Sequence, residues 1–469
     1  MTAAAPLSRR FIFTMYLPDT NRTIVALATP PGPGALAIIR LSGPCAFSAA
    51  AGFTGPPRPK PSHRMIKMLN VMDGSRLIDR AVAVFFKAPA SYTGQDTVEI
   101  TCHGSPYITR TILNLAVRSG AHLATPGEFT LRAFMNGKLD LAQAEAVGSL
   151  IASSSAAAHR AAITQMQGEL SGRVILLKHK AIRLLAQLEA RLDDSYEETG
   201  PVATTSFLRE IKKLKKDTLD LAAGFEAGRG IQEGIKAVIT GAPNSGKSSL
   251  LNALLGYPRA IVSARAGTTR DTLDAKLEID GFDVIFTDTA GLNASAKHPL
   301  ETEGIRRAKK AISEADIILL LKDCSTPHDP SDDLARLQAA QLASEGSALI
   351  NVLTKTDLPA RISASRSIKT SCRTGAGLKA LRRALVARQK KYLRDGDQAP
   401  VISARHFEAL RNCAAALDGL ESRMQKKPQE LELAAEHLRE ALRALGTISG
   451  ETAPEEVLTD IFKNFCVGK

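Results

Sequence analysis

The sequence has no tryptophan, and aromatic side chains make up only 4% of its 469 residues. Hydrophobic residues still account for 44% of the chain, so its cores are expected to pack mainly alanine and leucine. This composition favours a helix-rich protein. The length exceeds that of one ordinary domain and predicts two to four domains.

Features typical of several other protein classes are also missing. No run of about 18 apolar residues occurs, so no membrane span is expected. The nine histidines show no metal-ligand spacing. The six cysteines form no C-x-x-C pair, which indicates reduced thiols in a cytosol-like compartment. These cysteines are Cys45, Cys102, Cys324, Cys372, Cys413 and Cys466.

Charge of one sign is in excess: the net charge is +13 and the pI is about 9.5. A basic balance favours a polyanionic partner such as RNA, although scattered charge also serves solubility alone. The densest basic run, Lys212–Lys216, is interpreted as a solvated helix face rather than an RNA contact. Residues 1–19 are predicted to be a disordered leader. The first 18 contain Arg9 and Arg10 but no acid, which is also a weak feature of transit peptides.

Residues 20–140 are predicted to form an α+β domain. Apolar and β-branched runs predict four strands, at Thr23–Ala28, Ala35–Leu41, Ile78–Lys87 and Thr97–Cys102. Pro106–Ser119 has the apolar spacing of an amphipathic helix that stops at Gly120. The Gly- and Pro-rich stretch Ala51–Pro61 is predicted to be a loop. The run Pro126–Asp140 reads, by composition alone, as a helix cap and turn.

The rest of the chain predicts a helical domain that is interrupted by an α/β domain. Residues 141–232 are almost wholly helical in pattern, with one break near Asp193–Pro201. Residues 233–392 alternate strand and helix, which is the order of a doubly wound parallel sheet. Residues 393–469 return to helices and finish with a short one at Pro454–Phe465. This order predicts that the α/β domain is inserted within the helical domain.

The most specific motif is a P-loop, G-A-P-N-S-G-K-S-S, at Gly241–Ser249. It lies between an apolar, β-branched run and a run with helical character, which is the context that a P-loop match requires. Backbone N–H groups of such a loop, and of the helix that follows, face a chain of phosphates. Lys247 is predicted to reach the terminal phosphates, and the Ser248 hydroxyl is predicted to be a Mg²⁺ ligand.

Two motifs that complete a phosphate and Mg²⁺ site follow the P-loop. Asp288-Thr289-Ala290-Gly291 comes after an apolar strand, and it supplies an acidic residue near Mg²⁺ and a glycine N–H for the γ-phosphate. Gly267–Asp271 lies between the two motifs. Within it, Thr269 is the better candidate to complete the Mg²⁺ shell.

A guanine site is predicted from Thr354-Lys355-Thr356-Asp357, which follows the apolar run Ala348–Leu353. The Asp357 carboxylate can accept both N–H donors of guanine, and adenine lacks this pair, so the site selects GTP. Ser371-Cys372 then supplies the last base-contacting loop. The motifs together predict a GTPase whose nucleotide contacts are Asn244, Ser245, Gly246, Lys247, Ser248, Ser249, Ser263, Ala264, Arg265, Ala266, Gly267, Thr268, Thr269, Asp288, Thr289, Ala290, Gly291, Thr354, Lys355, Asp357, Ser371 and Cys372.

The residue that usually orients the attacking water is absent. Many GTPases place glutamine directly after D-T-A-G, whereas this chain has Leu292, and no arginine-finger donor is evident. Asn244 and the loop Ser263–Thr268 can instead ligand a monovalent cation where an arginine finger would sit. K⁺ is the predicted ion. A simple turn role for Asn244 is the alternative.

With these residues identified, the chain closely resembles the tRNA modification GTPase MnmE (TrmE) family from Thr23 to Lys469. In the first domain the resemblance rests on A-T-P-P-G, I-I-R-L-S-G, His103-Gly104 and Pro126–Asp140. In the α/β domain it rests on G-x-P-N-x-G-K-S-S, A-G-T-T-R-D and D-T-A-G-L. At the end of the chain it rests on F-C-V-G-K, which matches a C-terminal C-x-G-K.

The resemblance implies a K⁺-stimulated, Mg²⁺-dependent GTPase that forms a homodimer through its N-terminal domain. A partner of the MnmG (GidA) type, which uses FAD and NADH, would join it to add an aminomethyl or carboxymethylaminomethyl group to C5 of the wobble uridine of certain tRNAs. The one-carbon unit would come from 5,10-methylene- or 5-formyl-tetrahydrofolate bound in the N-terminal domain. The implied location is the cytoplasm, with the mitochondrial matrix as the alternative.

The resemblance also implies roles for individual residues. The folate contacts would be Arg40, Glu99, Lys138 and Lys469. The K⁺ ligands would be Asn244, Ser263, Arg265 (through its backbone) and Thr268, and the Mg²⁺ ligands Ser248 and Thr269. Besides Lys247 and Asn244, the catalytic residues would include Glu301, which orients the hydrolytic water through a second water, with Glu303 as the alternative. For Cys466, a buried structural thiol and a role in the modification chemistry are both open.

The chain departs from the family pattern at several positions, which we interpret as tuning. Pro33 and Ala35 replace an arginine and a glycine in the first loop. Thr354 replaces asparagine, which weakens one guanine contact, and Cys372 replaces alanine. The alternative function is a ribosome-assembly or RNA-binding GTPase switch. It is disfavoured because no KH-like G-x-x-G loop follows residue 390.

Overall fold

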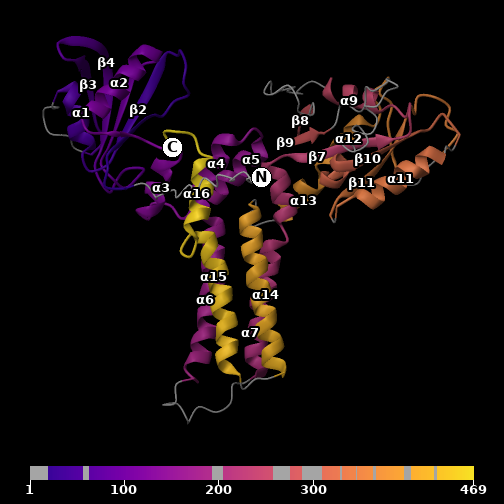
Figure 1. The fold of residues 1–469 in the computed structure, drawn as a ribbon. Coiled ribbons are helices and arrows are strands. Elements are labelled where there is room, and N and C mark those ends of the chain that lie inside the picture. The colour runs from indigo at the N-terminus through magenta and orange to yellow at the C-terminus, as the bar shows by residue number, and fades with distance from the viewer. Residues whose placement is uncertain are drawn as a thin grey trace, which may run out of the picture. The chain divides into compact units, whose positions relative to one another are not determined.

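The computed structural model describes residues 19–55, 63–192, 204–256, 275–287, 309–327, 330–344, 346–362, 366–395, 403–426 and 430–469 (Figure 1). The chain forms two compact units, one of residues 1–148 and 449–469 and the other of residues 149–448. The predicted leader, apart from Asp19, lies outside the described residues, as does the predicted break at Asp193–Pro201. Within the described residues, no helix is long and apolar enough to span a bilayer.

The first unit contains a six-stranded sheet in the order β3-β4-β5-β2-β1-β6, in which only β1 and β6 pair in parallel. Its strands are β1 (Ile24–Leu27), β2 (Leu36–Ser42), β3 (Met65–Asp73), β4 (Arg76–Phe86), β5 (Thr97–His103) and β6 (His122–Leu123). Two helices, α1 (Ala46–Thr54) and α2 (Pro106–Arg118), share its core and cover one face. Alternate residues of β4, such as Ala81, Ala83 and Phe85, point into that core.

The four predicted strands and the helix at Pro106–Ser119 are confirmed to within two residues at each end. Three elements were not predicted: β3, the two-residue strand β6 and α1. β3 carries Lys67 and Asn70 among methionines, and α1 extends to Thr54. The predicted loop Ala51–Pro61 is therefore wrong at its start, because alanines and Phe53 at helical spacing pack α1 on the sheet.

The run Pro126–Asp140 forms a helix, α3 (Glu128–Met135), rather than only a cap and turn. Its Arg132 is fully buried, pairs with Glu128 at 2.7 Å and donates to the carbonyl oxygen of Arg22 at 2.6 Å. The polar residues of the run thus fix the chain that enters β1. Phe462 of α16 (Glu455–Lys463) packs with Leu131 and brings the end of the chain against α3.

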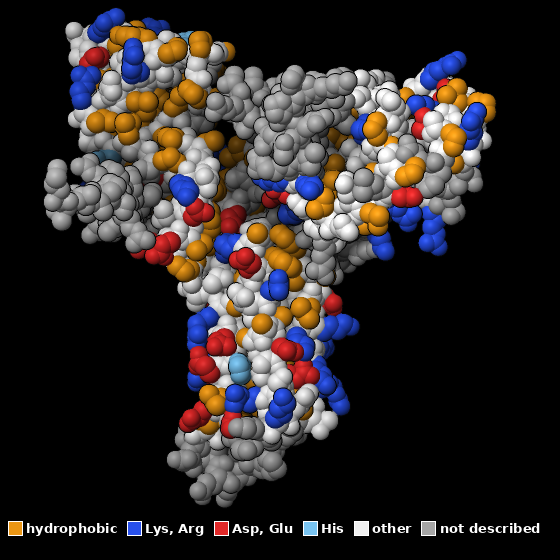
Figure 2. Space-filling model, turned by 45° about the vertical axis from the view of Figure 1, so that its right-hand side comes forward, with side chains coloured by type: hydrophobic (Ala, Val, Ile, Leu, Met, Phe, Trp, Pro, Cys, Tyr) orange, Lys and Arg blue, Asp and Glu red, His pale blue; other side chains and the backbone are white. Residues whose placement is uncertain are grey.

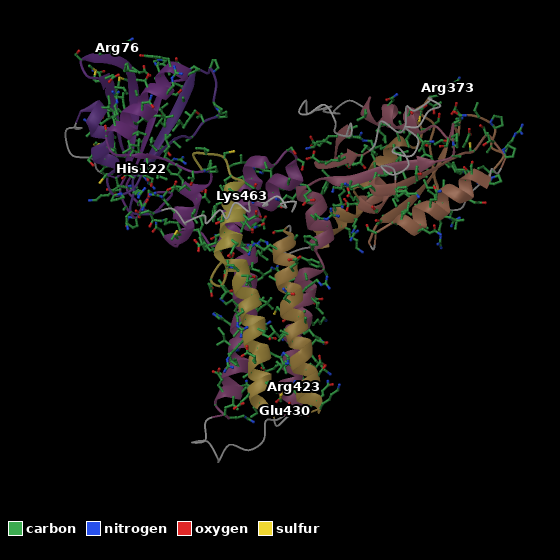
Figure 3. The ribbon with its side chains drawn as sticks, in the orientation of Figure 1. Arg76, His122, Arg373, Arg423, Glu430 and Lys463 are labelled. Atoms are coloured by element: carbon green, nitrogen blue, oxygen red, sulfur yellow. The ribbon has the colours of Figure 1, made fainter. Side chains whose placement is uncertain are left out.

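In the second unit, α6 (Glu169–Glu189), α7 (Thr204–Ala222), α14 (Ala404–Lys426) and α15 (Leu431–Ser449) run side by side as a long bundle (Figure 1). Buried residues on α6 repeat at three- and four-residue spacing, at Leu170, Val174, Leu177, Ala181, Leu184 and Leu188. Arg423, near the end of α14, and Glu430, just before α15, form an ion pair (Figure 3). The helical prediction is confirmed here.

Basic and acidic side chains are interspersed along the bundle surface (Figure 2). In the basic run of α7, Lys215 lies 2.8 Å from Asp418 and 2.6 Å from Glu421 of α14, and Lys212 lies 3.6 Å from Glu421. Half of this run therefore forms ion pairs within the bundle. It is not a purely solvated face.

The α/β part of the second unit is a six-stranded sheet in the order β12-β11-β10-β7-β9-β8. The strands are β7 (Ile235–Gly241), β8 (Ala275–Ile279), β9 (Phe282–Phe286), β10 (Ile317–Asp323), β11 (Ala348–Thr354) and β12 (Ile368–Lys369). All pairs are parallel except β8 with β9. The predicted doubly wound parallel sheet is confirmed, with one antiparallel edge strand.

Helices pack on both faces of this sheet. Alternate residues of β10 enter two separate cores: Leu319 and Leu321 face α9 (Lys247–Leu255) and α12 (Leu378–Leu385), while Ile318 faces α11 (Pro330–Leu342). The first core also contains residues from two helices that precede the sheet, α5 (Ala156–Met166) and α8 (Phe225–Gln232). The domain limits at residues 140, 232 and 392 stay predictions.

Candidate functional site

The P-loop connects the end of β7 to the start of α9 in the way that the motif predicts. Gly241, Asn244 and Gly246 have φ angles of 147°, 63° and 90°. A Cβ atom on Gly241 would collide with the carbonyl oxygen of Leu321 on the neighbouring strand, so only glycine fits there. These angles fold the loop back on itself ahead of the first turn of α9, where N–H groups are available for an anion.

Lys247 lies over this loop. Its Nζ atom donates to the carbonyl oxygens of Gly241 at 3.1 Å and Ala242 at 2.8 Å. Burial lowers the pKa of Lys247, because the protein replaces part of the water that would solvate the ammonium. An anion bound in the loop would restore a charge partner to this side chain. Ser248 follows in the first turn of α9, as a Mg²⁺ ligand would.

Thr354 at the end of β11 holds the P-loop. Its buried hydroxyl donates to the carbonyl oxygen of Ser245 at 2.7 Å, and the carbonyl oxygen of Lys322 is farther away at 3.3 Å. Within the described residues, the Ser245 side chain is buried and its Oγ atom has no hydrogen-bond partner. The hydroxyl of Thr354 thus joins the predicted guanine loop to the predicted phosphate loop.

The guanine loop is held by two further side-chain contacts. Lys355, at a φ of 56°, places its Nζ atom 2.6 Å from Asp323. Burial acts to raise the pKa of Asp323, but Lys355 and Ser325 outweigh it and lower that pKa. Ser371 donates its hydroxyl to Asp357 at 2.7 Å, which joins the two predicted base-contacting loops.

Asp357 is available as an ionised acceptor. The hydrogen bond from Ser371 lowers the pKa of this carboxyl, and the nearby charge of Arg373 (labelled in Figure 3) acts in the same direction. Burial raises the pKa of the half-buried Cys372 thiol, and the Asp357 charge adds to this effect. Cys372 is therefore a neutral thiol that lines the loop rather than a reactive thiolate.

Much of the predicted phosphate and cation site lies outside the described residues. This holds for the residues Ser263, Ala264, Arg265, Ala266, Gly267, Thr268, Thr269, Asp288, Thr289, Ala290, Gly291, Glu301 and Glu303. Of the predicted K⁺ ligands, the described residues include Asn244, which is exposed. Of the predicted Mg²⁺ ligands, they include Ser248.

A second cluster of predicted site residues forms on the sheet of the first unit. Arg40 of β2 and Glu99 of β5 are directly paired across the strands, and their side chains approach to 2.7 Å. The Arg40 guanidinium also donates to the carbonyl oxygen of Gly468 at 3.1 Å. Its carbon lies 5.8 Å from the Tyr92 ring centre and 5.7 Å from that of Phe129. Arg40 is thereby fixed in one orientation between an acid and two rings.

The end of the chain is seated on this cluster. Gly468 has a φ of 95° and lies so close to the Leu27 carbonyl that a Cβ atom would collide with it. Burial lowers the pKa of Lys469, and the positive charge of Arg40 lowers it further against the opposing effect of Glu99. Arg40, Glu99 and Lys469 thus come together as an electrostatic group.

The other two predicted residues of this region are placed differently. Lys138 donates to the Pro89 carbonyl oxygen at 3.1 Å, and none of its described contacts joins it to Arg40. The Cys466 side chain is exposed, so the prediction of a buried structural thiol is wrong. The alternative, a role in the modification chemistry, stays a prediction.

Three residues that shape the two sites were not predicted from the sequence. Tyr92 and Phe129 flank Arg40, and Asp323 orients Lys355. Asp323 could have been found, since it is the last residue of β10, at the strand end where such sheets bind ligands. The two aromatic residues carry no comparable signal.

Comparisons with known proteins cover both units. Residues 23–138 match the family described as GTP-binding protein TrmE N-terminus, and residues 141–466 match the MnmE helical domain. Among solved structures, the G domain of the T. maritima FeoB iron transporter is 23% identical and covers 34% of this chain and 98% of its own, with a TM-score of 0.25. Era in complex with MgGDPNP and a 16S ribosomal RNA fragment is 28% identical. It covers 38% of this chain and 65% of its own, with a TM-score of 0.25. A TM-score of 0.25 is too low to establish a structural relationship for either protein.

Several curated relatives match over nearly the full length, and each is named tRNA modification GTPase MnmE. The relative from Methylococcus capsulatus is 40% identical over 463 residues, which is 97% of this chain and 100% of its own. The relative from Akkermansia muciniphila is 39% identical over 460 residues (96% and 100%), and that from Chlorobium phaeobacteroides is 38% identical over 472 residues (95% and 97%). The chain therefore belongs to the tRNA modification GTPase MnmE (TrmE) family.

Proposed function

We propose that this protein hydrolyses GTP and acts in tRNA modification. The observation that carries the proposal is the link between the two halves of a nucleotide site. Lys247 lies over the P-loop, Asp357 is held as an ionised acceptor, and the Thr354 hydroxyl joins their loops through a 2.7 Å hydrogen bond. The names of the relatives supply the process, tRNA modification.

In the proposed reaction, the chain binds and orients GTP. Asp357 accepts the N–H donors of guanine, and the Lys247 ammonium stabilises the negative charge of the terminal phosphates. Ser248, with Thr269, would hold Mg²⁺, and Asn244, with Ser263, Arg265 and Thr268, would hold K⁺. When bound, these cations would neutralise charge that develops between the phosphates. Glu301 is proposed to orient the hydrolytic water.

The Arg40 cluster supports a proposal about the first unit. A fixed guanidinium, a paired carboxylate and aromatic rings suit a flat, anionic ligand such as a tetrahydrofolate derivative. Lys469 would add a cation when protonated. We propose that folate supplies the one-carbon unit of an aminomethyl or carboxymethylaminomethyl group on the wobble uridine, together with an FAD- and NADH-using partner of the MnmG type.

A homodimer through the first unit is also proposed. The sheet face opposite α1 and α2 exposes Ile66 (66% exposed) and Met68 (73% exposed) on β3. Apolar side chains at this exposure on an uncovered sheet face fit an isologous contact between two copies. Light scattering after size-exclusion chromatography would give the mass of the wild type and of Met68→Lys. A monomeric wild type would contradict the dimer.

The experiment that tests the GTPase is turnover by the purified chain in matched K⁺ and Na⁺ buffers, with and without Asn244→Ala. We expect strong stimulation by K⁺ and its loss in the variant, because the Asn244 side-chain oxygen is a proposed ligand. Turnover that is indifferent to the cation would overturn the K⁺ proposal and favour activation by a partner. Absence of GTP turnover in every buffer would overturn the GTPase itself.

A further inference from the structure

The hairpin of β8 and β9 connects two segments that are proposed to contact the nucleotide. β8 begins at Ala275, shortly after Thr269, and β9 ends at Phe286, shortly before Asp288. The strands pair in register from Ala275 with Phe286 to Ile279 with Phe282. Their two-residue turn, Asp280-Gly281, has positive φ at both positions, which fits the twist of a tight hairpin. The turn lies at the end of the hairpin away from both segments.

That turn is anchored on the N-terminus of α5. The backbone N–H of Ala157 donates to the Gly281 carbonyl oxygen at 2.9 Å. The Ser154 hydroxyl donates to the Asp283 carboxylate at 2.8 Å, and Lys276 pairs with the same carboxylate at 2.9 Å. Lys276 also lies 2.6 Å from the Ser154 hydroxyl. Side chains from both strands and from a residue two positions before α5 thus form a closed triangle, in which Asp283 is buried, Lys276 is partly buried and Ser154 is exposed.

Apolar packing extends this anchor. Ala157 and Ala161 of α5 are buried in the same core as Leu277 of β8 and Phe282 of β9. The N-terminal end of α5 also carries partial positive charge, which favours the nearby carboxylate of Asp283. The hairpin and α5 therefore share both polar contacts and a core.

The hairpin is also tied to two helices of the α/β part. Asp280 pairs with Lys390 of α13 (Ala387–Asp395), and the guanidinium of Arg382 on α12 donates to the Glu278 carbonyl oxygen at 3.3 Å. A displacement of the hairpin would therefore move α5 or break the polar contacts that hold the hairpin.

We propose that the contact of the β8–β9 hairpin with α5 couples the nucleotide site to the helix bundle, with Ser154 and Asp283 as its positioning residues. The inference rests on the proposed function. α5 ends at Met166 and bundle helix α6 begins at Glu169, so a displacement of α5 reaches the bundle across two residues. Neither Ser154 nor Asp283 belongs to the proposed GTP contacts. Their loss therefore separates tRNA modification from GTP hydrolysis.

The decisive experiment compares two activities of the full chain with its FAD-dependent partner, tRNA and folate. In Ser154→Ala we expect GTP turnover within about twofold of the wild type, but about tenfold less modified tRNA per GTP, the equivalent of one hydrogen bond to a charged group. Asp283→Asn should behave in the same way. Ser153→Ala is the matched control, because the Ser153 hydroxyl donates to the Leu150 carbonyl oxygen at 2.7 Å and makes no described contact with the hairpin.

Each other outcome rejects the coupling. If Ser154→Ala lowers both activities in proportion, the contact only stabilises the fold. If it behaves like Ser153→Ala, the contact transmits nothing. Hydrogen exchange at the Ala157 amide gives a second readout, which we expect to differ between GDP and a GTP analogue in the wild type but not in Asp283→Asn. This readout needs no tRNA, so a wild type that fails to modify tRNA would overturn the proposed function without obscuring the coupling.

Discussion

The two six-stranded sheets of this protein present their candidate site residues in different ways. In the first unit, Arg40 and Glu99 project from the middle of two antiparallel strands, on the face opposite the helices. In the second unit both faces are buried by helices, and Lys247, Thr354 and Asp357 follow or end strands. A sheet face that is only partly covered can use residues in the interior of its strands, whereas a sheet covered by helices on both faces presents its site residues at the strand ends.

The largest effect is expected at a strand end, at Lys247. Lys247→Ala removes the ammonium that lies over the P-loop, and with it the charge proposed to stabilise the transferring phosphoryl group. We expect GTP turnover to fall by about 100- to 1,000-fold, the loss typical of one electrostatic contact to the transition state. Phosphate release from GTP measures it. Lys379→Ala, an exposed lysine on α12, is the control. A fall below tenfold would remove Lys247 from the catalytic residues.

The next effect concerns base selection by Asp357. Asp357→Asn replaces one of the acceptors for guanine with a donor, so GTP affinity should fall by about 100-fold or more while xanthosine triphosphate binds better. Competition with a fluorescent nucleotide measures both affinities. Equal loss for the two nucleotides would mean that Asp357 supports the loop without reading the base.

The pH dependence of guanine binding should follow from the ionisation of Asp357. Because the pKa of Asp357 is lowered in the folded chain, its acceptor form is present above that pKa and is lost only as the pH falls through it. Guanine binding should therefore persist below the usual titration range of a carboxyl group. In Ser371→Ala the lost hydrogen bond should move the decline in GDP affinity to higher pH.

A smaller effect is expected on the partly covered sheet face. Arg40→Gln leaves Glu99 without its ion-pair partner and removes the donor to Gly468, so affinity for 5-formyl-tetrahydrofolate should fall by about tenfold or more. Calorimetric titration measures this, with Arg80→Gln, an exposed arginine on β4, as the control. Unchanged affinity in Arg40→Gln would break the comparison, because this face would then not be the ligand site.

The smallest effect is expected at Thr354. Thr354→Val keeps the shape of the side chain but removes the hydrogen bond to Ser245, which should weaken GDP binding by about five- to tenfold. Thr354→Ser restores the donor and should recover most of the affinity. If the valine and serine variants bind GDP equally, the hydroxyl does not couple the two loops.

The described part of the candidate nucleotide site was largely predictable because its chemistry is local. A P-loop needs particular glycines, a lysine and a hydroxyl at fixed spacing, and Gly241 and Lys247 lie where that spacing puts them. The tie from Thr354 to Ser245 was not predictable, since it joins residues 109 positions apart through one hydroxyl rotamer. The sequence predicts only that Thr354, in place of asparagine, weakens a base contact.

The contacts of Arg40 and of α5 depend still more on tertiary structure. The Arg40 side chain contacts the carbonyl oxygen of Gly468, which lies 428 positions later in the chain. Every residue has a backbone carbonyl, so the sequence carries no signal for this contact. Ala157 and Ala161 read as ordinary members of a helical bundle, because alanine fits any close helix contact. Their burial in the core of the α/β sheet follows from the docking of α5 and not from their own pattern.

The seating of Gly468 against Leu27 also bears on how the chain is made. The segment 449–469, which completes the first unit, emerges from the ribosome after all 300 residues of the second unit, 149–448. At ordinary rates of synthesis this is a delay of roughly 15 to 60 s. During that interval the nascent first sheet carries Arg40 and Glu99 without their closing segment. The Arg40 cluster, the proposed folate site, therefore becomes complete last, and a chain released before residue 449 would lack the segment that closes it.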